Sequence, residues 1–373
     1  MKIALITPGN KPLPPSPCSS IEIYLSHLAK ELAERHWVSL YGKISPKQAT
    51  NSGGLRIKPI ASGNYLQQVI QDMKYNKPAV IQIDNRPAYV KTVRDNIKAP
   101  VILNIHSTIF LSKKRITPKV LKASFNSAHT AVVNSNYLGR YLVKRYKELN
   151  NKVYAIHPGV DLDRFPSRFS PLGQSIRELK RREMRVTNKT VLLYAGRLIP
   201  RKGLLLLLQV FAQLIIKYPS LQLWIVGGKP QPKKNPFHRK ILALAKGLPI
   251  RFFPLLPHGK MHGFYLAADL FVCPSQLPEA FGMVNIEAAS CGLPSVGSNA
   301  WGIRESIAHG TSGWLVKPYH SKAAWVKTIG KVLADPQLLV DTGKKARHWV
   351  YNSYSWKRVA GEFEALYHFI LKR

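Results

Sequence analysis

Residues 191–228 read VLLYAGRLIPRKGLLLLLQVFAQLIIKYPSLQLWIVGG, and this stretch decides the fold. A short apolar run ends at Gly196, a polar turn leads into an apolar helical pattern over 203–217, and a second apolar run ends at two glycines. Short apolar runs that end at turn residues are typical of buried strands, and a helix between two of them makes a βαβ unit. The stretch therefore predicts a parallel sheet covered by helices.

The same alternation extends in both directions along the chain. Strands are expected at KIALIT, WVSLYG, AVIQID, VILNIH and AVVNS before this stretch, and at IRFFPL, LFVCPS and LPSVGS after it. Two such series in 373 residues predict two doubly wound α/β domains. We place the first domain at 1–168 and the second at 169–355, with the seam in the polar, basic stretch 166–189. An amphipathic helix over 356–373 follows the second domain.

Charge is the most unusual feature of the composition. The chain has 56 Lys and Arg against 19 Asp and Glu, a formal net charge of +37, which attracts polyanions. Basic clusters occur at 112–119, 140–147 and 177–185, but no nucleic-acid recognition motif accompanies them, so nucleic acid is not an expected partner. An anionic membrane or an anionic glycan explains the first two clusters, and a generally basic surface explains them equally well.

Cysteine usage and hydropathy predict where the protein works. Its three cysteines form no C-x-x-C pair, which argues against a disulfide framework or a zinc site and fits a reducing cytoplasm. The longest apolar run, 204–216, is too short to cross a bilayer, and the first residues, MKIALIT, read as a strand rather than a signal peptide. A cytoplasmic protein, soluble or peripheral to a membrane, is therefore expected.

The turn YAGRLIPRKG at 194–203 is a candidate phosphate site. Gly196 lets the backbone approach a ligand closely, Arg197 offers a fork of donors, and Lys202 adds a compact charge. Together they suit a diphosphate. The alternative is an ordinary basic surface turn.

Residues 278–294, PEAFGMVNIEAASCGLP, place two of the few carboxylates close together. Gly282 marks the start of a helix, where free backbone N–H groups form an anion site. Glu279 lies just before this start, and Glu287 lies inside the helix beside small residues, unlike a solvated helix face. Because a carboxylate repels phosphate, we expect both glutamates to bind hydroxyls of a ribose or a sugar.

His106 ends the predicted strand of LNIHSTIF at 103–110. A single histidine is more often structural than catalytic. Its position is still suggestive, because ligands of open α/β sheets bind beyond the carboxyl ends of the strands.

These motifs together resemble the large family of retaining, nucleotide-sugar-dependent glycosyltransferases known as family 4. The resemblance extends nearly end to end and includes VNSNYLGRYL, IHPGVDLDRF, YAGRLIPRKG, LWIVGGKP and GTSGWLV, besides the two glutamates separated by seven residues. It implies the GT-B architecture, in which two Rossmann-like domains face each other across a cleft and the C-terminal helix returns to the first domain. VIQIDNRPAYV and VDLDRF are most similar to glycosyltransferases associated with bacterial spore coats.

The resemblance also implies roles for individual residues. Arg197 and Lys202, with Gly196, would bind the donor diphosphate, Glu279 would contact the donor sugar, and Glu287 would hold the ribose. His106 would meet the sugar from the first domain. The backbone N–H groups of one short segment would complete the diphosphate site: Phe281, Gly282, Met283 and Val284.

The implied reaction moves a sugar from a nucleoside-diphosphate sugar to a hydroxyl acceptor with the anomeric configuration retained. A UDP-sugar is the expected donor, a glycan or a lipid-linked molecule the expected acceptor, and cell-surface or spore-coat glycan synthesis the expected setting. No cofactor or metal is expected, since no Asp-x-Asp stands near the phosphate loop.

One departure from the family pattern leaves a second interpretation open. Ser19 and Ser20 occupy the place of a glycine pair before the first long helix, where a Cβ could close part of the site. A catalytically degenerate protein, retained for structure or binding, is therefore the main alternative. A sugar-nucleotide epimerase or a phosphorylase of similar architecture is a lesser one.

Overall fold

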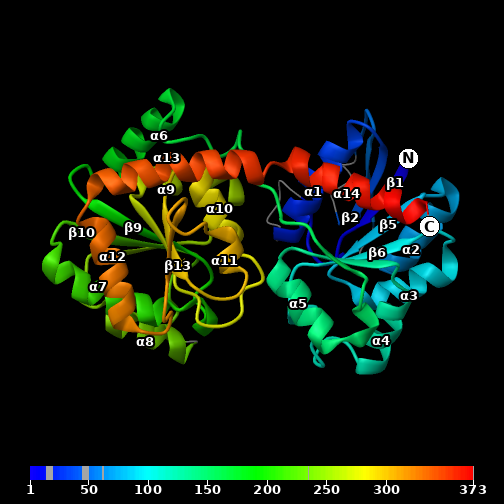
Figure 1. Cartoon of the computed structure of the whole chain (residues 1–373), viewed down its shortest axis with the longest axis horizontal. Coiled ribbons are helices and arrows are strands. Elements are labelled where there is room, and N and C mark those ends of the chain that lie inside the picture. The colour runs from blue at the N-terminus through cyan, green and yellow to red at the C-terminus, as the bar shows by residue number, and fades with distance from the viewer. Residues whose placement is uncertain (14–19, 44–49, 61–62, 234, 373) are drawn as a thin grey trace. The chain divides into compact units, whose positions relative to one another are not determined.

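The chain divides into two compact units, each built around its own sheet (Figure 1). This computed structural model describes residues 1–13, 20–43, 50–60, 63–233 and 235–372. The first unit comprises Met1–Gly159 and Trp356–Arg373, and the second comprises Val160–Ser355. The expected class, two doubly wound α/β units, is confirmed.

The sheet of the first unit has eight strands in the order β3-β4-β2-β1-β5-β6-β7-β8. All neighbours pair in parallel except β3 and β4, which form an antiparallel edge. The strands are β1 Lys2–Ile6, β2 Trp37–Gly42, β3 Thr50–Ser52, β4 Leu55–Pro59, β5 Val80–Asp84, β6 Val101–Ile105, β7 Thr130–Val133 and β8 Val153–Ala155.

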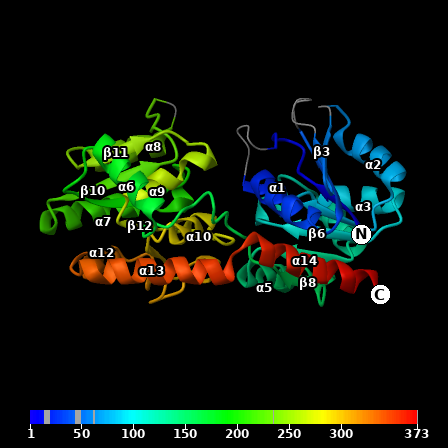
Figure 2. The same cartoon turned by 90° about the horizontal axis from the view of Figure 1, so that it is seen from above.

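Helices cover this sheet on both faces, as Figure 2 shows. They are α1 Ser20–Ala33, α2 Tyr65–Asn76, α3 Pro87–Asn96, α4 Pro118–Ser127, α5 Asn136–Arg145 and α14 Trp356–Leu371, with short 3₁₀ helices η2 Thr108–Leu111 and η3 Lys147–Leu149. The terminal helix α14 packs on α1 and buries Val359, Phe363 and Tyr367 in a core shared with Leu25 and Leu28. The expected return of the C-terminal helix to the first unit is therefore confirmed.

The sheet of the second unit has six parallel strands in the order β11-β10-β9-β12-β13-β14. They are β9 Thr190–Ala195, β10 Leu221–Val226, β11 Ile250–Phe253, β12 Leu270–Cys273, β13 Ser295–Ser298 and β14 Gly313–Val316. The helices are α6 Pro171–Glu183, α7 Leu204–Lys217, α8 Pro236–Ala245, α9 His262–Ala267, α10 Met283–Ser290, α11 Ile303–Ser306, α12 Lys322–Leu333 and α13 Pro336–Ser353, with 3₁₀ helices η4 Pro200–Lys202 and η5 His258–Lys260.

The boundary between the units differs from the one expected after residue 168. Residues 160–168 belong to the second unit, because Val160 and Phe165 are buried in its core. The basic stretch expected to be the seam contains α6, whose first turn is capped by the Ser170 hydroxyl accepting from Gly173 N. Two of its arginines, Arg177 and Arg181, bond inward to the second unit rather than forming an open basic cluster.

Candidate active site

The turn after β9 is shaped by close backbone contacts. Gly196 N donates to Val226 O at 2.8 Å, and a Cβ on Gly227 would lie 1.9 Å from Gly196 O. Gly203 has φ +72°, and a Cβ there would lie 1.8 Å from Pro274 O. Only glycine permits these approaches, which bring the 196–203 turn against the loop that follows β12.

Lys202 and Glu279, far apart in sequence, meet where these two loops touch. Lys202 Nζ lies 2.7 Å from Glu279 Oε2, and Arg201 Nη2 lies 4.0 Å from the same oxygen. Arg201 also donates to Pro278 O. The Arg197 side chain is exposed, and its guanidinium bonds no described residue. The loop pair thus holds three cations and one carboxylate, a net positive site next to α10.

Helix α10 begins without a side-chain cap. Its N-cap is Gly282 with φ +98°, where a Cβ would lie 2.8 Å from Asn285 Nδ2. Neither Met283 N nor Val284 N donates a hydrogen bond to a described residue. Two backbone donors at a positive helix end are therefore available to an anion.

Glu287 lies on α10 with 5% of its surface exposed. Its Oε1 accepts from His258 Nε2 at 2.9 Å, and its Oε2 accepts from the Tyr265 hydroxyl at 2.8 Å. Burial, followed by the Glu287 charge, raises the pKa of Tyr265, so the phenol keeps its proton and donates it. The Glu287 carboxylate is therefore fixed in orientation from two sides.

Sequence reasoning did not find His258 and Tyr265. His258 opens η5, and Tyr265 lies on the next helix, α9. The available signal was position, because His258 follows the short loop after β11, and ligands of open α/β sheets bind beyond the carboxyl ends of the strands.

In the first unit, His106 follows the last residue of β6. Its Nε2 donates to Asp84 Oδ1 at 2.7 Å, and its backbone N donates to Asn85 Oδ1 at 2.8 Å. Sequence reasoning missed Asp84, although its signal was a carboxylate at the end of the strand AVIQID. Ser20 is the exposed first residue of α1, and Ser19 lies outside the described residues.

The predicted site residues thus form two groups. The second unit brings together Arg197, Lys202, Glu279, the start of α10 and Glu287, and the first unit carries His106 and Ser20. Among the described residues, no group of three or more His, Cys, Asp or Glu side chains is arranged to hold a metal ion. No helix in those same ranges is both long enough and apolar enough to cross a membrane.

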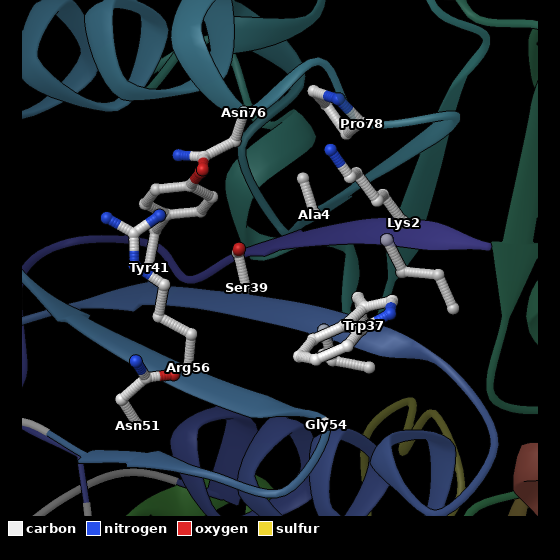
Figure 3. A pocket seen from close by; sticks show the side chains of 12 residues that line it. Lys2, Ala4, Trp37, Ser39, Tyr41, Asn51, Gly54, Arg56, Asn76 and Pro78 are labelled. Atoms are coloured by element: carbon white, nitrogen blue, oxygen red, sulfur yellow. The ribbon is translucent and has the colours of Figure 1, made fainter.

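A hollow of about 230 Å³ lies elsewhere on the first unit (Figure 3). Lys2 and the 66% exposed Trp37 line one part of it, and Arg56 and Asn76 line another. Lys2 and Trp37 begin parallel strands, whereas His106 follows the end of one. The hollow therefore lies toward the opposite end of the sheet from His106.

Comparison with known proteins shows which protein family the chain resembles. The family model described as glycosyl transferases group 1 matches residues 175–349, and the model described as glycosyltransferase family 4 matches residues 21–164. Spore coat protein SA of Bacillus subtilis (strain 168) is 27% identical over 98% of this chain and 99% of its own length. The lipopolysaccharide 1,2-N-acetylglucosaminetransferase of Salmonella typhimurium is 37% identical over 47% of each chain.

A solved structure supports the fold independently. The crystal structure of Anabaena HepE in complex with UDP-glucose superimposes with a TM-score of 0.76 at 21% identity, covering 98% of this chain and 99% of that one. The two family models, taken together, span most of both units. The chain therefore belongs to the glycosyltransferase family that these models describe, and its two α/β units have the GT-B fold.

Proposed function

We propose that the protein transfers a sugar from a nucleoside-diphosphate sugar to a hydroxyl acceptor, with retention of the anomeric configuration. The observation that carries the proposal is the convergence of Lys202, Glu279, Glu287 and the uncapped start of α10 in one region of the second unit. Cations and free N–H groups suit a diphosphate, and the adjoining carboxylates suit the hydroxyls on either side of it.

The diphosphate would be bound by the basic turn and the helix start. The free guanidinium of Arg197 can bind a phosphate in a bidentate manner, and Lys202 supplies a compact charge. Met283 N and Val284 N add neutral donors at the positive end of α10. Each of these groups favours the charge that develops on the diphosphate as the glycosidic bond breaks.

The carboxylates would bind hydroxyl groups. Glu287 already accepts one hydrogen bond on each oxygen, and a carboxylate has about four acceptor positions, so it can also accept from two ribose hydroxyls. Glu279 would contact the donor sugar, and His106 of the first unit would hydrogen-bond another sugar hydroxyl. These assignments leave the cations for the diphosphate.

The proposed chemistry needs no covalent sugar–enzyme intermediate. The bond from the anomeric carbon to the diphosphate oxygen breaks, and the acceptor oxygen attacks the same face of the sugar. The departing diphosphate takes the acceptor proton. A double-displacement mechanism would instead need a reachable carboxylate nucleophile. Asp84, the carboxylate next to His106, is fully buried and bonded, and Glu279 is paired with Lys202 and assigned to the sugar hydroxyls, so we give neither of them that role.

A UDP-sugar is the proposed donor, and spore-coat or other cell-surface glycan synthesis is the proposed setting. HepE, which shares the fold, binds UDP-glucose, and Spore coat protein SA is similar over the whole chain. The acceptor, a glycan or a lipid-linked molecule, would lie at an anionic surface that the basic first unit can approach.

Thermal unfolding in the presence of UDP, GDP, ADP or CMP tests the donor site. A nucleotide at about 100 times its Kd should stabilise the protein by roughly 2.7 kcal/mol. We expect UDP to raise the Tm of the wild type and to do so much less in Glu287→Gln, because the ribose loses a charged acceptor. The exposed Glu178→Gln serves as the matched control and should behave as the wild type.

Two outcomes would contradict the proposal. No shift with any of the four nucleotides would exclude a nucleoside-diphosphate site, and an equal UDP shift in Glu287→Gln would exclude the ribose contact. Release of UDP from UDP-sugars then separates an enzyme from the degenerate alternative that Ser19 and Ser20 suggest, since a binding protein would bind UDP without releasing it from any donor.

A further inference from the structure

A chain of polar side chains is buried in the middle of the first unit. The Tyr367 hydroxyl, on α14, donates to Gln82 Oε1 at 2.6 Å, and Gln82 Nε2 donates to Asp84 Oδ2 at 2.9 Å. Asn104 Nδ2 and His106 Nε2 both donate to Asp84 Oδ1, at 2.8 and 2.7 Å. Gln82, Asp84 and Tyr367 are completely buried.

Stability alone does not account for this arrangement. The other residues of β5 are apolar and buried. Moving a carboxylate out of water costs a desolvation free energy on the order of several kcal/mol, which its hydrogen-bond partners must offset. Apolar side chains of similar volume generally serve a core as well or better. The Asp84 carboxylate nevertheless receives three N–H donors, so its negative charge is held at one position directly behind His106.

The His106 ring is held from several sides. Asp84 fixes Nε2, the Tyr24 ring packs edge-on against the imidazole at 4.6 Å, and Asn85 Oδ1 accepts from the backbone N. Asn134 Nδ2 donates to the His106 carbonyl at 3.2 Å. No described residue hydrogen-bonds Nδ1, and 11% of the side chain is exposed. Only this nitrogen is left for a ligand.

We propose that Asp84 is a positioning residue that keeps the Nε2 proton of His106 turned inward and so leaves Nδ1 to accept a hydrogen bond from a sugar hydroxyl. An ionised carboxylate can only accept, so a neutral ring beside it carries its proton on Nε2 and a lone pair on Nδ1. Gln82, on β5, donates to the carboxylate and keeps it in place, and Tyr367 holds Gln82 from the terminal helix α14. The inference rests on the sugar contact proposed for His106.

The arrangement also determines which sugars fit. A lone pair on Nδ1 attracts a hydroxyl, which has a proton to donate, and repels the oxygens of a carboxylate. The buried Asp84 charge behind the ring adds to that repulsion. A donor with a neutral hexose should therefore be used in preference to one with a uronic acid whose carboxylate replaces the bonded hydroxyl.

Nitrogen-15 NMR of the histidine side chains tests the inference without relying on activity. The His106 signals are assigned by their absence in His106→Gln. In the wild type at neutral pH we expect the neutral ring to carry its proton on Nε2. In Asp84→Asn, where the amide can donate as well as accept, we expect a mixture of tautomers. Asp95→Asn removes an exposed charge from the same unit and should leave the His106 signals unchanged.

Turnover provides the second measurement. Asp84→Asn should lower kcat with UDP-glucose by about 10- to 100-fold, the size of loss known for metal-binding histidines whose orienting partner is removed. It should leave UDP affinity unchanged, because the diphosphate and ribose residues lie in the second unit. Tyr367→Phe, which keeps the Asp84 charge, should lower kcat less than Asp84→Asn does. In Asp84→Asn, the ratio of activity with UDP-glucose to activity with UDP-glucuronic acid should be smaller than in the wild type.

The failures of the two proposals are distinguishable. The positioning role of Asp84 would be overturned, whatever the activity, by either of two NMR results. One is a His106 proton on Nδ1 in the wild type, and the other is the same His106 tautomer in Asp84→Asn as in the wild type. The expected tautomers, in a protein that neither binds nor turns over nucleotide sugars, would instead overturn the proposed function and leave the Asp84 contact as found. Unchanged kcat in a correctly folded Asp84→Asn would also overturn the inference.

Discussion

Glu279 and Lys202 form the closest ion pair at the proposed donor site, 2.7 Å apart and each less than a fifth exposed. If Glu279 serves the sugar, removing its charge should leave Lys202 free for the diphosphate. Glu279→Gln is therefore expected to bind UDP as tightly as the wild type or more tightly, and to have a much lower kcat. Lys202→Met is expected to raise the UDP Kd by about 10- to 100-fold, the value of a hydrogen bond to a charged group.

Isothermal titration with UDP and an assay of UDP release separate the two effects. A Glu279→Gln variant that loses UDP affinity as strongly as Lys202→Met would mean that the carboxylate serves mainly to hold the lysine. That result would contradict the proposed contact between Glu279 and the sugar. Glu178→Gln, exposed on α6, is again the control for loss of one negative charge.

At the same scale, the sequence pointed to some residues of the proposed site and missed others for a physical reason. Lys202, Glu279 and Glu287 stand in loops and at a helix start whose local pattern already indicates phosphate chemistry. His258 is relevant to the site because it bonds Glu287, and Asp84 because it bonds His106. Both contacts form only when separate strands and helices pack together. No local pattern encodes such a pairing.

Among the elements, helix α6 is attached to the rest of the second unit mainly by polar side chains. Its arginines Arg177 and Arg181 donate to the carboxylate of Asp269 at 2.6 and 3.1 Å and to backbone carbonyls at the end of α9. Arg168 adds a third guanidinium 3.6 Å from Asp269. The apolar pattern used to find helices could not show α6, because its buried residues are Gly173 and Arg181 rather than an apolar stripe.

The strands were predicted better than this helix. The runs at β1, β9, β10 and β12 are almost entirely apolar, as strands covered on both faces must be. The antiparallel β3–β4 edge was not predicted, since residues 50–59 are mostly polar and lack such a run. The apolar pattern of the sequence thus predicts elements that are buried, and it does not predict polar elements that are attached to the rest of the unit by specific hydrogen bonds and ion pairs.

Asp269 also gives the second unit a predictable response to acid. Burial opposes its charged form, but the guanidiniums of Arg177, Arg181 and Arg168 outweigh burial and lower the pKa of Asp269. A carboxyl with a lowered folded-state pKa contributes stability above its unfolded-state pKa of about 3.9, and that contribution is lost as the pH falls toward the folded-state value. The unit should therefore lose stability below about pH 4.

Urea unfolding at pH 7 and at pH 3 measures this contribution. Asp269→Asn should cost about 3–5 kcal/mol at pH 7, because it leaves buried guanidiniums without their carboxylate. Its stability should then change less than that of the wild type on acidification. A variant equal to the wild type at pH 7, or one with the same drop between the two pH values, would show that α6 does not depend on this ion pair. Glu178→Gln on the same helix should match the wild type at both.

Over the whole molecule, charge is the property that single sites do not explain. One carboxylate per cation would still leave 56 − 19 = 37 Lys and Arg without a carboxylate. Asp84 and Glu287 are buried and bonded to His, Tyr or amide groups rather than to Lys or Arg, which leaves the surface more basic still. A field of this kind attracts anionic surfaces in general, so a specific surface must be shown against a control of equal charge.

Helix α5 carries a surface whose composition suits contact with an anionic membrane. Arg140 and Lys144 are exposed on it, and Tyr141 and Val143 beside them are 39% and 36% exposed. The 3₁₀ helix η3 packs against both α5 and α4, the latter preceded by exposed residues of the 112–119 cluster. Cations interspersed with apolar side chains suit a lipid headgroup region, where each cation contributes about 1 kcal/mol.

Sedimentation with phosphatidylcholine vesicles, with and without phosphatidylserine, tests this surface. Reversing Arg140 and Lys144 to glutamate should reduce binding to the anionic vesicles by about 10-fold or more, since two attractive charges of about 1 kcal/mol each become repulsive. Reversing Lys327 and Lys331, exposed on α12 with the same spacing, changes the net charge equally and should have little effect. Equal losses would mean that the overall field, not α5, attracts the membrane. Binding by the wild type that vanishes completely at high salt would exclude any insertion of Tyr141 and Val143, because screening weakens charge attraction and leaves apolar burial intact.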